Sequence, residues 1–208
     1  MSMHIALNAQ LLSFSASYRQ AGISRLIQGT LRGLQAIDQD NNYTVFVGAQ
    51  PIPADFFFNK LWTVAPSRLA ASNRPARILW EQTALPLAVY RRRADLLHAM
   101  AFVGPVSCPC PLVATVYDMT FVLFPEAFNR FNRSYLTTMT RATVQRAQRV
   151  IAISHSTARD LAQTFGLPPE RIDVAAPGVG EQFAPLPRGD VESFRARKGL
   201  PDRFLLFL

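Results

Sequence analysis

The sequence predicts an α/β protein built on a doubly wound, mostly parallel sheet with helices on both faces. Two observations lead to this fold class. Short apolar runs of strand length recur along the 208 residues, and stretches with helical spacing of apolar residues separate most of them. Several runs are apolar at nearly every position, as in strands buried on both faces of a parallel sheet. Such alternation favours right-handed crossovers and a sheet covered by helices.

The first half of the chain shows this alternation clearly. Strands are expected at His4–Leu12, Tyr43–Gly48 and Leu61–Ala65, and helices at Ile23–Asp38 and Ala76–Arg93. Pro86 should kink or split the second helix, because proline cannot donate the backbone hydrogen bond that a helix interior needs.

The second half continues the pattern. Strands are expected at Leu96–Met100, Leu112–Tyr117 and Val150–Ile153, with a polar, basic helix at Asn132–Gln148. The next helix carries apolar residues at i, i+3, i+4 and i+7, namely Ala158, Leu161, Ala162 and Phe165. Ser154 or Ser156 can cap its start, and Gly166 can end it. A short strand then leads to a Pro-Gly turn.

The end of the chain suggests a second domain. Pro185–Gly189 has the composition of a linker, Val191–Lys198 of a short helix, and Phe204–Leu208 of a buried strand. Because a strand needs neighbours, we expect residues 1–184 to form one domain. Residues 185–208 would then be a linker and the first strand of a truncated second domain.

Composition limits the class of protein. No apolar run approaches the ~18–20 residues of a membrane-spanning helix. The segment MSMHIALNAQLL has no basic residue before its apolar stretch, which favours a first strand over a signal peptide.

Cys108 and Cys110 have one residue between them, a poor spacing for a mutual disulfide. Incidental thiols are the main interpretation, with redox or metal chemistry as the alternative. We expect a cytoplasmic protein.

The chain is basic, with 22 Lys and Arg against 14 Asp and Glu and a formal charge of +8. Arginines cluster at Arg91–Arg93 and at Arg130, Arg133, Arg141, Arg146 and Arg149. Such a concentration of positive charge favours binding of nucleotide phosphates, anionic membranes or nucleic acid. The alternative is that these charge runs are only solvated helix faces.

The segment Arg149–Phe165 is the most informative part of the chain. Its strand turns into a helix through Ser154-His155-Ser156. Small polar residues at such a turn place free backbone N–H groups, and the positive end of the helix dipole, at the carboxyl edge of the sheet. Open α/β sheets bind phosphorylated or sugar ligands at this edge.

In order, the segments of the chain resemble the N-terminal half of a GT-B glycosyltransferase of the retaining family called group 1, or family 4. AGISR at Ala21–Arg25 lies where that family has a glycine-containing loop, and DLLH at Asp95–His98 matches its D-[IVL]-[IVL]-H strand end. ATVYDM at Ala114–Met119 matches T-V-H-D-L. Val150–Leu161 matches V-I-A-V-S-x-x-S-x-x-D-L, and Arg171–Pro185 matches K-I-x-V-x-x-N-G-V-D-x-x-x-F-x-P.

The resemblance implies a Rossmann-like acceptor-side domain, one half of a GT-B fold. The whole enzyme would transfer a sugar from a nucleotide-diphosphate-sugar donor to a glycan or lipid-linked acceptor, with retention of configuration. It implies no cofactor and no metal. The family's donor-binding segment, E-x7-E, belongs to the second domain and is not in this sequence, so the chain alone is expected to be inactive.

The resemblance also supplies candidate substrate-binding residues, while the catalytic residues stay unknown. The candidates are Gly22, Ser24, Arg25, His98, Tyr117, Asp118, Ser154 and His155. Each has a structural alternative: a turn glycine, a surface arginine, a hydrogen-bonded histidine, a packed tyrosine, or a cap of a loop or helix. Tyr117 stands where the family usually has His, so that residue's role cannot be transferred. Glu81 resembles a family position near the acceptor-side helix, without an assigned role.

The alternative function is a non-catalytic basic α/β module that binds anionic lipid or nucleic acid. Nucleic acid is not expected as a partner, because no RNA- or DNA-reading motif is present and the aromatic residues are not interleaved with the arginines. Peripheral contact with an anionic membrane is compatible with the transferase. The motifs G-x-S-x-G, G-x-G-x-x-G and G-x-x-x-x-G-K-[ST] are absent, which removes the hydrolase, dinucleotide and P-loop classes.

Overall fold

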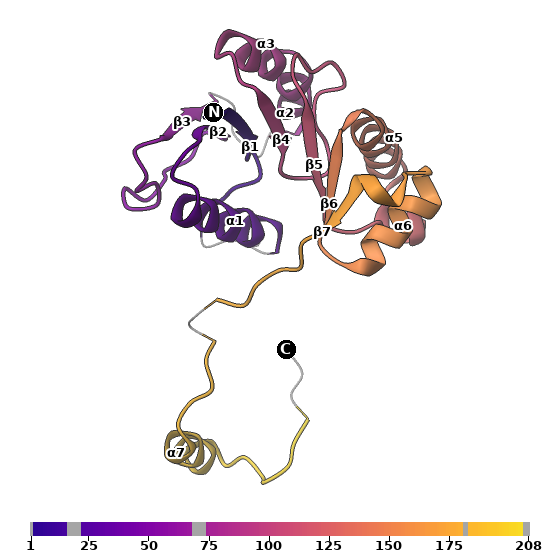
Figure 1. Cartoon of the computed structure of the whole chain (residues 1–208). Coiled ribbons are helices and arrows are strands. Elements are labelled where there is room, and N and C mark those ends of the chain that lie inside the picture. The colour runs from indigo at the N-terminus through magenta and orange to yellow at the C-terminus, as the bar shows by residue number, and fades with distance from the viewer. Residues whose placement is uncertain (1, 16–21, 68–73, 181–182, 206–208) are drawn as a thin grey trace. The chain divides into compact units, whose positions relative to one another are not determined.

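A seven-stranded parallel sheet forms the centre of the first of two units into which the chain divides, Met1–Pro177 and Gly178–Leu208 (Figure 1). The computed structural model describes residues 2–15, 22–67, 74–180 and 183–205. The strands are β1 (His4–Asn8), β2 (Asn42–Val47), β3 (Trp62–Pro66), β4 (Leu96–Ala99), β5 (Leu112–Val116), β6 (Arg149–Ala152) and β7 (Ile172–Val174). Every predicted strand of this unit is present.

The order of the strands defines a doubly wound sheet. The order is β3-β2-β1-β4-β5-β6-β7, and every neighbouring pair in it is parallel. The chain moves outward from β1 to β3, returns to β4 beside β1, and then moves outward in the other direction. The direction of winding therefore reverses between β1 and β4, where parallel sheets of this kind open a crevice at their carboxyl ends. The predicted fold class is confirmed.

The helices agree with the periodicity of the sequence. They are α1 (Ile23–Ile37), α2 (Arg74–Gln82), α3 (Ala84–Arg91), α5 (Arg130–Arg146) and α6 (His155–Phe165). The described part of the unit also contains the short helices α4 (Thr120–Leu123), η2 (Pro125–Ala127) and η3 (Pro169–Arg171). α4 was not predicted, because four residues are too few to show a helical period. None of the helices in the described residues is both long and apolar enough to cross a membrane.

The expected helix at residues 76–93 is split, although not at Pro86. α2 ends at Gln82 and α3 begins at Ala84, so Pro86 lies in the first turn of α3. In the first turn a backbone N–H has no intrahelical acceptor, so a proline removes nothing there. Inside one continuous helix its ring would instead clash with the carbonyl of Gln82, four residues earlier. The break before Pro86 avoids that clash.

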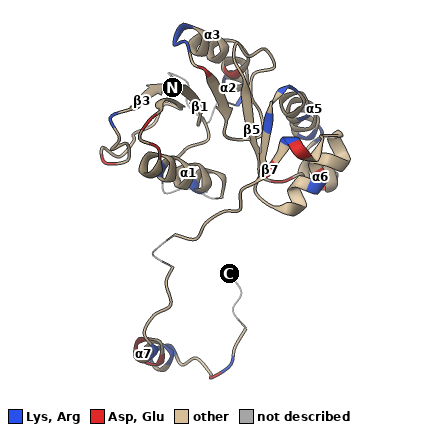
Figure 2. Cartoon of the chain, in the orientation of Figure 1, with Lys and Arg blue, Asp and Glu red and all other residues tan. Residues whose placement is uncertain are grey.

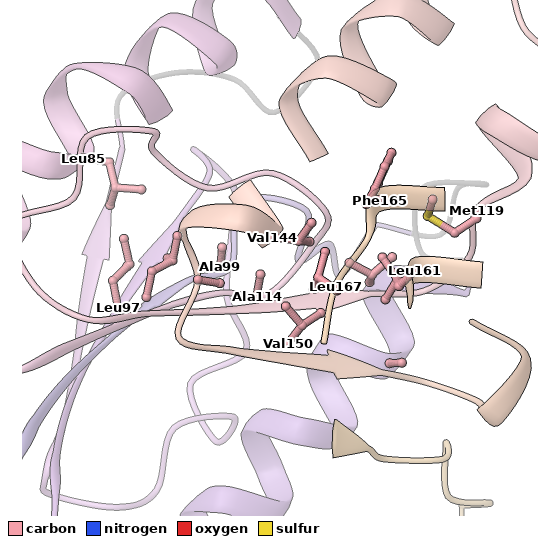
Figure 3. Packing of buried hydrophobic residues seen from close by; sticks show 14 of the residues in the cluster. Leu85, Leu97, Ala99, Ala114, Met119, Val144, Val150, Leu161, Phe165 and Leu167 are labelled. Carbon is pink, nitrogen blue, oxygen red and sulfur yellow. The ribbon is translucent and has the colours of Figure 1, made fainter. Parts of the chain in front are cut away.

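Two apolar clusters lie on opposite faces of the sheet. Neighbouring residues of β1 show the alternation: Ala6 belongs to one cluster and Leu7 to the other. α1 covers the Leu7 face with Ile27 and Leu31. On the other face, α3, α5 and α6 pack against β4, β5 and β6 (Figure 3). The members of this cluster that Figure 3 labels are Leu85, Leu97, Ala99, Ala114, Met119, Val144, Val150, Leu161, Phe165 and Leu167. Helices therefore cover both faces.

The second unit contains the helix α7 (Arg188–Lys198), which ends at Gly199 in the left-handed conformation with φ 62°. The short helix predicted after the linker is confirmed. The strand expected at Phe204–Leu208 is not formed at Phe204 and Leu205, which are exposed and have no regular structure. The described residues of this unit offer no neighbouring strand with which they could pair. The rest of the expected strand, residues 206–208, lies outside the described residues.

Candidate functional site

The carboxyl ends of the parallel strands bring distant parts of the sequence to one edge of the sheet. β1 ends at Asn8, β4 at Ala99, β5 at Val116 and β6 at Ala152. Because β1 and β4 are neighbours at the point where the winding reverses, the residues after these strands line the usual ligand position of the fold. Five of the residues expected to bind substrate lie in or just after these strands, namely His98, Tyr117, Asp118, Ser154 and His155, and the other three, Gly22, Ser24 and Arg25, lie at the start of α1 (Ile23–Ile37).

Tyr117 follows β5 and is buried at this edge. Its hydroxyl donates a hydrogen bond to the carbonyl oxygen of Met100 at 2.7 Å, and its ring packs edge to face against Phe102. Burial raises the pKa of Tyr117, so the hydroxyl keeps its proton. The hydroxyl of Thr157 in turn donates to the carbonyl oxygen of Tyr117 at 3.1 Å. Tyr117 thereby joins the ends of β4 and β5 to the start of α6.

Asp118 is half-buried and forms a turn with the start of α4. Its Oδ1 accepts hydrogen bonds from the backbone N–H of Thr120 at 2.9 Å and from the Thr120 hydroxyl. This is the capping geometry of a short polar side chain that bonds to the backbone two residues further along. The loop-cap alternative is therefore present in the structure, and contact with an acceptor hydroxyl stays a prediction.

Ser154 caps α6. Its Oγ accepts a hydrogen bond from the backbone N–H of Thr157 at 3.1 Å, and its backbone is extended, as an N-cap requires. Of the two serines that the sequence offered, Ser154 is the cap. Gly166 ends the helix in the left-handed conformation, as predicted. His155 is the first residue of α6 and is exposed. The helix thus directs the positive end of its dipole to the carboxyl edge.

Gly22 precedes α1 with φ 36° and ψ −90°, a backbone conformation that strongly favours glycine. Arg25 is exposed on the first turn of the helix. Ser24 is buried, and its Oγ donates to the carbonyl oxygen of Ser13 at 3.0 Å and accepts from the Ser13 N–H at 2.8 Å. Ser24 therefore anchors the segment after β1 to α1. Ala21, the first residue of the matched loop, lies outside the described residues.

His98 lies inside β4 and not beyond its end. The side chain is buried, and Nε2 lies 2.8 Å from Oγ1 of Thr115 on the neighbouring strand. Burial lowers the pKa of His98 to about 4, so the ring is neutral near pH 7. This is the geometry of the structural alternative, a histidine bonded to a neighbouring strand.

A buried carboxyl group at the same edge did not emerge from the sequence as a candidate site. Glu81, on α2, is 6% exposed, and its Oε1 accepts a hydrogen bond from Nδ2 of Asn8 at 3.3 Å. Burial raises the pKa of Glu81 to about 7, against the opposing effects of the Arg77 charge and the Asn8 hydrogen bond. The carboxyl group is therefore close to half-protonated at neutral pH.

Two residues at and just after the end of β1, one of them the Asn8 that contacts Glu81, carry unpaired polar atoms. Oδ1 of Asn8 and Nε2 of Gln10 are buried, and neither has a hydrogen-bond partner in the described structure. Oε1 of Gln10 accepts from the hydroxyl of Ser67 at 3.3 Å. Buried amide groups of proteins are normally paired, so unpaired ones mark a place where a ligand or water completes the network.

Helix α5 also contributes to the electrostatics of this region. Burial raises the pKa of Tyr135 to about 12, with a smaller contribution from the charge of Glu81. Arg74 on α2 donates a hydrogen bond from Nη1 to Oδ1 of Asn132 on α5 at 2.5 Å. Besides the family resemblance already noted for Glu81, the sequence signal for this site is a carboxylate within a mostly apolar helical stretch, ILWEQTALPL. The described residues contain no group of three or more His, Cys, Asp or Glu placed to hold a metal ion.

A comparison with protein-family models matches residues 21–183 to Glycosyltransferase Family 4. The match covers most of the chain and includes β4, β5 and β6 of the candidate edge, while β1 precedes it. The chain belongs to glycosyltransferase family 4, and its sheet is one half of a GT-B fold. A comparison with curated protein sequences gave no significant match.

Solved structures of glycosyltransferases share this fold. HepE from Anabaena, in complex with UDP and glucose, is 17% identical and aligns with a TM-score of 0.54 over 95% of this chain. WaaB, a lipopolysaccharide outer core galactosyltransferase in its apo form, is 10% identical with a TM-score of 0.51 over 90% of this chain. In both comparisons the chain spans about half of the other protein's length, 50%.

Proposed function

We propose that this chain is the acceptor-side half of a retaining glycosyltransferase that uses a nucleotide-diphosphate sugar and a glycan or lipid-linked acceptor. The observation that carries the proposal is the family match together with the polar groups at the carboxyl edge, where β1 and β4 meet. We propose a hexosyl donor, with UDP-glucose as the first compound to test because HepE was solved in complex with it. Polysaccharide biosynthesis in the cytoplasm is the corresponding role.

Groups at the carboxyl edge of the sheet can stabilise the charges that develop in this reaction. Transfer from a nucleotide-diphosphate sugar adds negative charge to the departing diphosphate and passes through a cationic sugar, so backbone N–H groups, cations and positioned polar groups stabilise it. The first turns of α1 and α6 bear the exposed side chains of Arg25 and His155. We assign the diphosphate to these helix starts. No metal or other cofactor is part of the proposal.

We assign the hydroxyl groups of the acceptor to the cluster of Asn8, Gln10 and Glu81. The unpaired Asn8 oxygen accepts and the unpaired Gln10 nitrogen donates, and a sugar hydroxyl can do both. Glu81, with its pKa near about 7, can hold or release a proton at the same place. Tyr117, Ser154 and Ser24 hold the surrounding backbone through the hydrogen bonds described above.

A donor-binding lobe is needed to complete the proposed enzyme, in keeping with the half-length matches to HepE and WaaB. The test compares the 208-residue chain with the same chain extended at its C-terminus by a donor-binding lobe of about 170–190 residues. With UDP-glucose and a panel of saccharide and lipid-linked acceptors, we expect that only the extended protein will release UDP from UDP-glucose. Equal turnover by the short chain would contradict the assignment to one half.

The stereochemical part of the proposal has its own measurement. Proton NMR of the first product formed reports whether the transferred sugar keeps the anomeric configuration that it had in the donor. Retention supports the proposal, and inversion would exclude it without affecting the assignment to the family.

A separate observation favours peripheral contact with an anionic membrane. Phe124 and Phe131, next to α4 and on α5, are 55% and 74% exposed, and the exposed Arg130 and Arg133 lie on the same helix as Phe131. Figure 2 shows basic residues along α5. Exposed aromatic side chains with arginines are typical of surfaces that enter lipid headgroups.

Co-sedimentation with vesicles tests this contact. Vesicles that contain phosphatidylglycerol should bind the chain, while phosphatidylcholine vesicles should not, and R130E with R133E should abolish the binding. R159E, an exposed arginine on α6, is the matched control. Tight, salt-sensitive binding to oligonucleotides, with no preference for anionic vesicles, would instead favour the nucleic-acid module.

A further inference from the structure

Two thiols lie side by side in the loop between β4 and β5, on the side where β5 begins. Cys108 and Cys110 flank Pro109, both are free and partly exposed, and their Sγ atoms are 3.8 Å apart. This is a hydrogen-bond distance for sulfur. The sequence spacing made these residues poor candidates for a pair, but the local backbone directs both side chains to one place.

Neighbouring helices hold this loop. Nη2 of Arg146, at the end of α5, donates to the carbonyl oxygen of Cys108 at 3.1 Å. Gln82, at the end of α2, donates from Nε2 to the Gly104 carbonyl at 3.0 Å and accepts the Val106 N–H at 3.0 Å. The two thiols are therefore presented on an anchored loop.

The two sulfur atoms are not equivalent. The hydrogen bond between the two thiols, in which either sulfur can be the donor, lowers the pKa of Cys108 to about 7, and the nearby Arg146 charge acts in the same direction against burial. The pKa of Cys110 is raised, first by its hydrogen bond to Cys108 and then by burial, with a smaller effect of the Asp95 charge. Cys108 is therefore the first candidate for the attacking thiol, with Cys110 as the resolving thiol.

We propose that Cys108 and Cys110 form a redox-active dithiol that exchanges with low-molecular-weight disulfides such as glutathione disulfide. The Cys108 thiolate attacks one sulfur of the glutathione disulfide, forms a mixed disulfide and releases one glutathione thiolate. Cys110 then loses its proton and attacks Sγ of Cys108, which releases the second glutathione. The protein loses two electrons and two protons, and one disulfide becomes two thiols.

Geometry favours exchange over metal binding at this place. Two sulfur ligands fill half of a tetrahedral zinc site, and the described residues supply no third His, Cys, Asp or Glu to such a group. Closure to a disulfide brings the two Sγ atoms from 3.8 Å to about 2.05 Å, a movement that rotation of the two side chains can begin. The proposal does not depend on the transferase function.

Intact-mass measurement on the reduced 208-residue chain, incubated with glutathione disulfide at neutral pH, tests the dithiol. The wild-type chain should lose two hydrogen atoms and retain no glutathione. Cys110→Ser should accumulate one stable glutathione adduct, because the resolving thiol is gone. Cys108→Ser should react more slowly than Cys110→Ser, because burial still raises the pKa of the remaining Cys110 thiol.

Far-UV circular dichroism and thermal unfolding establish that each variant is folded before its rate is compared. Equal rates for the two single variants would overturn the assignment of nucleophile and resolving thiol. A wild-type chain that keeps glutathione on one or both cysteines would overturn the dithiol itself. The same holds if stoichiometric zinc binds tightly and blocks the exchange, because the pair would then be a metal site.

Discussion

Asn8 and Glu81 are 73 residues apart in the sequence and are joined by a side-chain hydrogen bond of 3.3 Å at the end of β1. Asn8 is the last residue of β1, and Glu81 is the one buried residue of the described helix α2. The pair places a carboxyl group that can titrate near neutral pH where the winding of the sheet reverses. A buried carboxyl group with a raised pKa is typical of functional sites.

The raised pKa of Glu81 makes a prediction about stability. The folded state, with a pKa of about 7, keeps a proton that the unfolded chain, near 4.5, has already lost. Stability from this group is therefore complete below about pH 4.5 and declines as pH rises toward 7. Asn8, Arg77 and Tyr135 face this group. E81Q should remove this decline, which is at most about 1.4 kcal/mol per pH unit.

Urea unfolding at pH 5 and pH 7.5 measures the effect, with E126Q, at an exposed glutamate of η2, as the control. If the free energy of unfolding changes with pH equally in E81Q and the wild type, the carboxyl group is not buried as described. In the extended transferase, E81Q should also lower kcat/KM for the acceptor while the KM for the donor stays constant.

His98 makes the stability of the fold depend on pH with the opposite sign. Its folded pKa of about 4 lies below the ordinary value of 6.5, because burial disfavours the charged ring. Its contribution to stability is complete above pH 6.5 and is lost as pH falls toward 4. H98Q, which can keep a hydrogen bond to Thr115, should flatten the acid side of the profile by up to about 1.4 kcal/mol per pH unit.

Chemical denaturation between pH 4 and pH 7 detects this change. H155Q removes an exposed imidazole at the start of α6 and serves as the matched control. If the free energy of unfolding of H98Q falls with pH as steeply as that of the wild type, His98 is not buried and neutral as described.

Ser154 should contribute more to stability than its neighbour Ser156. S154A removes the side-chain acceptor for the Thr157 N–H and should cost about 1 kcal/mol. S156A replaces an exposed serine in the first turn of the same helix and should change stability by less than about 0.5 kcal/mol. Thermal or urea unfolding of the two variants compares them directly, and equal losses would argue against the capping role.

Gly104 should tolerate no side chain. A Cβ at this position would lie 2.9 Å from Cβ of Ala99 and 3.4 Å from a methyl group of Leu112, both buried in neighbouring strands. G104A should destabilise the chain by about 1–3 kcal/mol through overpacking. G29A, on the exposed side of α1 with no atom near its Cβ, should instead stabilise it by up to about 1 kcal/mol. A neutral G104A would contradict the close packing of the loop against β4.

Much of the fold could be predicted because the signals are local. The apolar spacing of Leu161 and Phe165, the cap at Ser154 and the stop at Gly166 all lie within or beside one helix, and the structure has each of them. The position of the break between α2 and α3 could not be predicted in this way. It depends on which turn holds Pro86, and packing of Leu85 and Val89 on the sheet fixes that turn.

The sequence by itself determined the parallel α/β class, the positions of most strands and helices, and the resemblance to family 4. Periodicity, capping and turn residues act over a few neighbouring positions, so the chain carries this information locally. Only the tertiary structure decided that Asn8 meets Glu81, that Ser24 and His98 make internal hydrogen bonds, and that Cys108 and Cys110 face each other. These relations depend on strand pairing, on how helices pack on the sheet and on the exact path of a loop, which no local pattern of residues specifies.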